Sequence, residues 1–373
     1  MTEIITKKYL INGPINVIRL TNGIKVLYIF GDYHLAPDWQ SECPINDKYE
    51  TMDIDKFISL FIKTEKTKHF DLFAEMYPKY FNEQQYPQRG KYIHNFMKLF
   101  QAKLKKSDNE VKINTMYPNF RFHFMDIRGT IPLFEPIFYF FKNFDHSNNI
   151  TYSKIRFHLF EHIQNLEEII NYLKSKSNRY IDKLKNKYSN KDIKDKINKL
   201  YEELITNLIN LKQISVETYN ALKEHFKTND KLNELLNKNM LFIENHSMDI
   251  MVVLTDLYFI RRFLDKKYIM NSILYTGNFH LCNITYLLVK YFDFQITNVY
   301  YYNNIINPDP KKLENKVLSL KSHNYNYIVE LDKDLKQHIN NMSKSTISPA
   351  IAPLPKETVY QCVNLMKFPD NFS

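Results

Sequence analysis

Short apolar runs that stop abruptly at a polar residue or a glycine constrain the fold of this chain more than any other feature. The runs occupy residues 24–30, 70–74, 121–125 and 272–276, and they are followed by Gly31, Glu75, Asp126 and Gly277. Runs of this length and apolarity, each leading into a loop or a helical pattern, are typical of buried strands in α/β proteins. We therefore predict an α/β fold with a mainly parallel sheet flanked by helices.

The first of these runs is also predicted to be the second strand of a hairpin. Residues 15–20 and 24–30 flank Asn22-Gly23, a dipeptide that strongly favours a tight turn between antiparallel strands. After this hairpin, a loop with two prolines leads to a helix that begins near Asp53, a residue type favoured at the N-cap.

Residues 151–266 follow a different pattern, with Leu and Ile at helical spacing, many Lys, Asn and Glu, and no glycine. Breaks near residues 189–190 and 228–230 predict three or four helices. We predict a long helical insertion here. It separates a first part of the α/β domain, at residues 1–150, from a second part at residues 267–342, and residues 343–373 are predicted to form a surface tail.

Composition narrows the class of protein. Only 6 of the 373 residues are glycine, which excludes a Gly-rich dinucleotide-binding fingerprint, and the net charge of +10 favours acidic partners without naming one. Three cysteines are too few for a disulfide framework, so a reducing compartment is expected. A signal peptide and a long apolar span are not recognised, so we expect an intracellular soluble protein without a membrane partner.

The pattern Gly-x-x-His occurs twice, as Gly31 to His34 and as Gly277 to His280, each time at the end of an apolar run. Ligands of open parallel sheets bind at the carboxyl ends of the strands, where a glycine lets the chain turn sharply. These two histidines are therefore candidates for one site. The alternative is two turn glycines with incidental histidines.

Glu75 and Asp126 end two further runs, so the same edge is predicted to collect two histidines and two carboxylates. Such a set is typical of a divalent metal site or of an acid–base cluster. Arg128 is a candidate for stabilising an oxyanion. The structural alternatives are an ion pair of Glu75 with an arginine and an ion pair between Asp126 and Arg128.

Two other groups of charged residues have less specific explanations. Asp249 and Asp256 lie seven residues apart in an apolar helical segment, where they either support the site or hold Arg261, Arg262 or nearby backbone. The lysine-rich stretch from Lys174 to Lys199 is interleaved with aspartates, so a solvated helical face is favoured over a nucleic-acid surface.

The order of these motifs resembles the TraB/TIKI superfamily, which includes ChaN-like haem-binding proteins and erythromycin-esterase-like enzymes. The resemblance rests on both Gly-x-x-His corners, on Glu75 and on Asp126 with Arg128, and it covers a third of the chain. It implies a metal-dependent protease or esterase, or a haem carrier. The Lys- and Asn-rich composition is also similar to that of giant DNA viruses, which would place the protein in the host cytoplasm or the virion.

Together these features predict a metal-dependent hydrolase of a peptide or ester bond. His34, Glu75 and His280 would hold a divalent ion such as Mn²⁺, Co²⁺ or Zn²⁺, whose bound water is the nucleophile. Asp32 or Asp126 would accept the proton, and Arg128 would stabilise the oxyanion. The alternatives are a non-catalytic binding or structural protein, of a virion for example, and a haem- or iron-binding protein that uses the same histidines.

Overall fold

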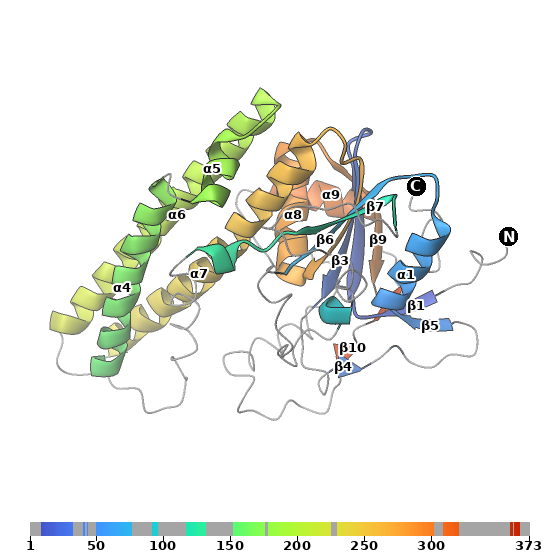
Figure 1. The fold of residues 1–373 in the computed structure, drawn as a ribbon. Coiled ribbons are helices and arrows are strands. Elements are labelled where there is room, and N and C mark those ends of the chain that lie inside the picture. Colours follow the sequence, from blue (N-terminus) through green and yellow to red (C-terminus); the bar gives the residue numbers. More distant parts are fainter. Residues whose placement is uncertain are drawn as a thin grey trace. The chain divides into compact units, whose positions relative to one another are not determined.

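The computed structural model describes residues 9–32, 40–41, 43, 50–76, 92–95, 117–131, 152–175, 178–224, 230–301, 309–320, 359–360 and 362–365. The chain divides into two compact units, and Figure 1 labels most of their helices and strands. The α/β unit comprises residues 1–126, 266–338 and 355–373, and the helical unit comprises residues 127–265 and 339–354.

A six-stranded sheet in the order β7-β6-β8-β3-β2-β9 organises the α/β unit. Its strands are β2 (Asn16–Thr21), β3 (Val26–Asp32), β6 (Phe70–Ala74), β7 (Phe120–Phe124), β8 (Asn271–Gly277) and β9 (Gln295–Tyr301). Strands β7, β6, β8 and β3 are parallel neighbours, whereas β2 runs antiparallel to both β3 and β9. The predicted α/β class is confirmed, and the sheet is mixed because the hairpin strand β2 lies inside it.

The predicted hairpin turn forms at Asn22-Gly23. Gly23 has a φ of +82°, which glycine adopts without strain, and Asn22 Oδ1 accepts hydrogen bonds from the backbone N–H groups of Ile24 and Lys25. Strand register then pairs Thr21 with Val26 and Asn16 with Gly31. The turn therefore sets which residues of β2 and β3 lie side by side.

The two faces of the sheet pack against different helices. On one face, α1 (Ile54–Thr64) contributes Ile54, Ile58 and Phe61 to a core cluster that also contains Phe70 and Tyr275. Helix α8 (Asn278–Tyr291) packs on β3 and β8, and α9 (Pro310–Ser319) packs on α8 and β9. Because side chains alternate along a strand, the neighbours of the α1-side residues point toward the opposite face.

Register brings the carboxyl ends of the parallel strands together at one edge of the sheet. Asp32 of β3 pairs with Gly277 of β8, and Ala74 of β6 pairs with both Tyr275 of β8 and Phe124 of β7. Residues that directly follow these strands therefore leave the sheet at the same edge, as the sequence predicted.

Two smaller sheets and a disulfide hold the segments that flank the large sheet. The strands are β1 (Tyr9–Asn12), β4 (Gln40–Ser41), β5 (Glu50–Asp53), β10 (Val359–Tyr360) and β11 (Cys362–Asn364), with orders β11-β1-β5 and β10-β4. Cys43 and Cys362, 319 residues apart and both buried, form the disulfide. The sequence did not predict this bridge, because one long-range pair has no spacing signature.

The carboxyl-terminal segment also differs in part from the predicted surface tail. Cys362 and Val363 are fully buried, and β11 pairs antiparallel with β1. A strand of three residues is too short to show an alternating pattern in the sequence, so it was indistinguishable from a loop. The sequence also predicts a last strand at residues 325–331, which lie outside the described residues.

The helical unit contains α4 (Tyr152–Lys174), α5 (Arg179–Asn186), α6 (Lys191–Glu224) and α7 (Asp230–Asp265), together with the one-turn helix η3 (Arg128–Thr130). Helix α5 ends at Asn186 and α6 begins at Lys191, so this boundary falls at the predicted break near residues 189–190. Leu and Ile side chains are buried between the helices, and none of the lysines described between residues 174 and 199 is buried. Across the described residues of both units, we find no helix with the length and apolarity that a membrane span requires.

Candidate functional site

Glu75 and His280 meet at the carboxyl edge of the sheet. His280 Nε2 lies 3.0 Å from Glu75 Oε1, and the two side chains are 4% and 8% exposed, respectively. Glu75 directly follows β6, and His280 lies in the first turn of α8, which directly follows β8. Because β6 and β8 are parallel neighbours, the strand order places two of the three predicted metal ligands in contact.

The carboxylate of Glu75 is held at the amino-terminal end of α8. Its Oε2 accepts hydrogen bonds from Thr276 Oγ1 at 2.9 Å and from the backbone N–H of Gly277 at 2.6 Å. The N-cap residue Gly277 has no side chain to cap the helix, so Glu75 supplies the acceptor from the neighbouring strand. The partial positive charge of a helix amino terminus also favours an ionised carboxylate at this place.

Gly31 has a different role from the sharp turn that the sequence suggested. It lies within β3, and an added Cβ would overlap Asn16 Oδ1 and approach Leu281 Cδ1 to 2.9 Å. Asn16 is fully buried and donates from Nδ2 to Asn278 Oδ1 at 2.7 Å. Glycine at position 31 therefore gives room for an Asn16–Asn278 hydrogen bond that joins β2 to the first residue of α8.

Asp32 points to the other side of the sheet edge. Its carboxylate is fully buried and accepts a hydrogen bond from Tyr275 Oη at 2.7 Å. Tyr275 belongs to the α1-side core, whereas the Glu75–His280 contact involves α8. Burial, followed by the charge of Asp32 and its hydrogen bond, raises the pKa of Tyr275 well above its usual range, so the phenol stays protonated as the donor.

The other candidates are less closely defined. Asp126 follows β7 by two residues and is partly exposed, while Arg128 belongs to the helical unit, where it begins η3. His34 lies outside the described residues. Within the ranges that the structure describes, no group of three or more His, Cys, Asp or Glu side chains is placed to hold a metal ion.

The atoms that Glu75 and His280 present are nevertheless compatible with a divalent ion. Two ligands that bind one ion at about 2.1 Å and at right angles are themselves about 3 Å apart. The separation of 3.0 Å between Nε2 and Oε1 satisfies this requirement, and it equally satisfies a direct hydrogen bond. The bonds from Thr276 and Gly277 to Oε2 resemble the outer-shell bonds that orient carboxylate ligands.

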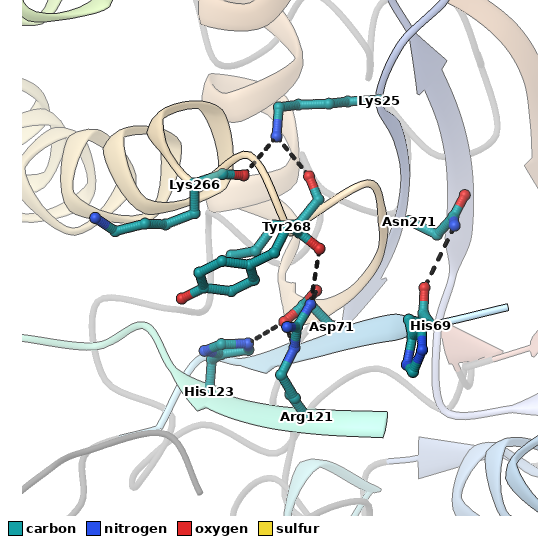
Figure 2. Close-up of polar contacts among 9 residues, drawn as sticks. Lys25, His69, Asp71, Arg121, His123, Lys266, Tyr268 and Asn271 are labelled. Carbon is teal, nitrogen blue, oxygen red and sulfur yellow. Dashed lines mark hydrogen bonds and ion pairs between the residues drawn. The ribbon is translucent and has the colours of Figure 1, made fainter. Parts of the chain in front are cut away.

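A second buried cluster, around Asp71, was not predicted from the sequence (Figure 2). Asp71 is the second residue of β6, and its carboxylate accepts two bonds from Arg121, at 2.8 and 2.6 Å. His123 Nε2 lies 2.5 Å from Asp71 Oδ1, and the imidazole stacks on Phe73. Alternation along β7 puts Arg121 and His123 on one face, and that spacing was the available signal.

The same region anchors the loop that enters β8 (Figure 2). Lys25 Nζ donates to the carbonyl oxygens of Lys266 and Ile269, and Arg121 donates to that of Tyr268. The guanidinium carbon of Arg121 also lies 4.3 Å from the centroid of the Tyr268 ring. These contacts hold the loop before β8 to the side chains of Lys25 and Arg121.

The two roles predicted for the acids of α7 remain predictions. Arg261 donates to the carbonyl oxygen of Lys187, and Asp256 is fully buried. Arg261 therefore holds nearby backbone, within the helical unit. The side chain of Asp249 lies outside the described residues.

Comparisons with known proteins identify relatives but no activity. The sequence matches a family of unknown function (DUF5847) over residues 9–181 and 212–373. Uncharacterized protein R706 of Acanthamoeba polyphaga mimivirus is 30% identical, over 83% of this chain and 91% of the relative. Uncharacterized proteins R160 and R161 of the same virus are 29% and 25% identical, covering 80% and 78% of this chain and 88% of each relative. These relatives agree with the giant-virus composition, and no solved structure matches the chain.

Proposed function

Since the chain belongs to DUF5847, a family of unknown function with relatives in a giant virus, we propose its activity from its site: a metal-dependent hydrolase of peptide or ester bonds. The observation that carries the proposal is the contact between Glu75 Oε1 and His280 Nε2 at the carboxyl edge of the sheet. Ligand sites of open α/β sheets occur at this edge. The resemblance to the TraB/TIKI superfamily supports the same assignment.

Glu75 and His280 would hold the ion, and His34 is the proposed third ligand. A bound divalent ion would supply an acidic water and polarise the scissile carbonyl. Thr276 and Gly277 fix the direction of the Glu75 carboxylate, so the chain provides a preorganised ligand.

Two further roles of the proposed reaction are the acceptance of the proton from the attacking water and the stabilisation of the oxyanion. Asp126, partly exposed after β7, is the proposed proton acceptor in preference to Asp32, because Asp32 is fully buried and bonded to Tyr275. The oxyanion role that the sequence assigns to Arg128, a residue of the helical unit, stays a prediction. In this proposal the helical unit is an insertion in the α/β chain, and the protein acts in the host cytoplasm or within the virion.

A second candidate is a non-catalytic structural or binding protein that keeps the same edge for folding. One observation in its favour is that Glu75 Oε2 already accepts two bonds from the chain while Oε1 contacts His280. The other is the buried Cys43–Cys362 disulfide, since disulfides are typical of proteins outside reducing compartments and occur on virion surfaces.

Metal content and hydrolysis separate the two candidates. The full chain is purified without chelator, its metal is quantified by elemental analysis, and turnover of chromogenic esters and a mixed peptide library is measured with Mn²⁺, Co²⁺ or Zn²⁺. The variants are Glu75→Gln and His280→Gln, and the matched control is His123→Gln, which alters the other carboxylate–imidazole contact. The hydrolase proposal predicts loss of metal and turnover in the first two variants alone.

A contrary result would favour the structural candidate. If the wild-type protein contains no stoichiometric metal, binds none of the three ions and hydrolyses none of the probes, the hydrolase proposal is wrong. The Glu75 and His280 variants would then change only the midpoint of thermal unfolding.

A further inference from the structure

Cationic side chains gather on α5 and on the carboxyl end of α7 in the helical unit. Arg179 and Lys183 are four residues apart on α5 and therefore share one face of that helix. Lys187 is the C-cap residue of α5, and Arg261 and Arg262 lie on α7, which packs against α5. We refer to these five residues as the α5–α7 cationic cluster.

Arg261 is the innermost member of the cluster. It is 5% exposed, donates from Nη2 to the carbonyl oxygen of Lys187, and has its guanidinium carbon 5.4 Å from the centre of the Tyr188 ring. Its Nε and the Nε of Arg262 are buried and have no hydrogen-bond acceptor among the residues described for this unit. Buried N–H donors are nearly always bonded in native proteins, so these two guanidinium groups carry donors that the described residues do not use.

The acids closest to the cluster are already engaged. Asp265 is 2% exposed, and its Oδ1 accepts bonds from the backbone N–H groups of Ser189 and Asn190 and from Ser189 Oγ. Asp182 lies 3.5 Å from Lys187 Nζ and accepts a bond from Asn186. Asp182 therefore already lies beside one cluster member, Lys187, whereas Asp265 accepts bonds from Ser189 and Asn190.

The titration of Lys183 agrees with an excess of positive charge. Burial lowers the pKa of Lys183, and the charges of Arg179, Arg262, Arg261 and Lys187 lower it further. Neighbouring positive charges repel one another, and a bound anion would relieve that repulsion. The wider stretch is also cationic, with ten Lys or Arg against three Asp between residues 174 and 199.

We propose that the α5–α7 cationic cluster binds a phosphate group, with Lys183, Lys187 and Arg262 reaching it from the accessible side. Three arginines and two lysines, placed together by the packing of α5 on α7 and by the Arg261–Lys187 bond, match the charge and the several acceptor oxygens of a phosphate. The inference is independent of the proposed hydrolase, because its residues all belong to the helical unit. A nucleic-acid backbone is the competing source of phosphate. Binding such a backbone requires an extended row of cations, because its phosphates are spaced along a strand.

Isothermal titration calorimetry of the full chain with inorganic diphosphate, at low ionic strength, tests this proposal. We expect saturable binding at one site, weakened about tenfold by Lys183→Gln and further by Lys183→Gln with Arg262→Gln. The matched control is Lys194→Gln with Lys199→Gln on α6, which removes the same charge and should leave the affinity within about twofold. Lys183 is partly exposed, so the single variant preserves the test if the double variant does not fold.

Three outcomes would overturn the proposal. One is the absence of saturable diphosphate binding to the wild-type chain. Another is equal weakening in the α5–α7 and α6 variants, which would indicate diffuse attraction rather than a site. The third is binding of a 20-nucleotide DNA or RNA with steep salt dependence but no binding of diphosphate, which would assign the surface to a nucleic-acid backbone.

Discussion

The α/β unit contains two carboxylate–imidazole contacts, one near the start of β6 and one just beyond its end. His123 Nε2 lies 2.5 Å from Asp71 Oδ1, and both side chains are almost fully buried. Arg121 donates two hydrogen bonds to the same carboxylate. Glu75 and His280 lie 3.0 Å apart at the carboxyl edge, where a hydroxyl and a backbone N–H hold the carboxylate.

The difference shows that residue types alone do not decide what such a pair can do. In the Asp71 contact, a permanent cation balances the carboxylate inside the sheet, which is typical of a structural network. In the Glu75 contact, the carboxylate is oriented by dipoles at a helix amino terminus, where ligand sites of this fold class occur. We therefore propose that the first contact serves stability and the second serves ligand binding.

The largest expected effect is the loss of stability in Asp71→Asn. The change would leave Arg121 and His123 beside a neutral amide, and breaking a buried charged pair typically costs about 3–5 kcal/mol. Urea unfolding followed by circular dichroism measures the free energy of unfolding. A cost below that of Glu75→Gln would show that the two contacts have been assigned the wrong way round.

The Asn16–Asn278 contact next to the edge pair depends on Gly31. In Gly31→Ala, the added Cβ would displace Asn16 and Leu281. Overpacking of this kind lowers the free energy of unfolding by about 1–3 kcal/mol. Gly23→Ala is the matched control for a glycine with open space around it, where the positive φ alone opposes the side chain. If the midpoint of urea unfolding is the same for Gly31→Ala and for the wild type, the packing described around Asn16 is incorrect.

His162 on α4 extends the comparison to a buried imidazole in the helical unit. Burial lowers the pKa of His162 to about 3, against about 6.5 in an unfolded chain, so the unfolded state binds the proton more readily. The stability from this site is complete above pH 6.5 and is lost as the pH falls toward 3, by about 2 kcal/mol at pH 5. Unfolding of His162→Leu between pH 5 and 7.5 should lack this loss.

A partly exposed histidine on the same helix provides the control for that measurement. His158 lies near Glu161, and His158→Gln should retain the full pH dependence of the wild-type protein. A His162→Leu profile parallel to the wild-type profile would show that another group causes the acid sensitivity.

The smallest expected effect on stability is that of Glu75→Gln. Glutamine keeps an acceptor for Thr276 and Gly277, so the variant should lose about 1 kcal/mol. Its effect on metal binding should be large, because an amide is a much weaker ligand than a carboxylate. Thermal melting with and without Mn²⁺ measures both effects on one sample.

The sequence predicted the strands and the edge well because these depend on local patterns. Short-range signals in the sequence mark the Asn22-Gly23 turn, the apolar run of β3 and the ends of β6 and β8. Parallel pairing of β6 with β8 then brings Glu75 to His280. Gly31 was correctly singled out for the wrong reason, since its need for space arises from Asn16 on a neighbouring strand.

Features that depend on distant partners were not predictable. The Cys43–Cys362 bridge and the burial of β11 require the two ends of the chain to meet, which no local pattern specifies. The Asp71 cluster likewise depends on which strand lies beside β6, because register alone aligns Asp71 with Arg121. The roles proposed for Asp126 and Arg128 remain predictions.

The central claim is that the edge contact binds a metal ion and the inner contact does not. Isothermal titration of Mn²⁺, Co²⁺ and Zn²⁺ into the wild-type chain, Glu75→Gln and Asp71→Asn measures this directly, once circular dichroism has shown each variant to be folded. We expect one ion per wild-type and Asp71→Asn chain, and affinity reduced at least tenfold in Glu75→Gln. Equal affinity in Glu75→Gln and wild type, or no binding to either, would contradict the claim.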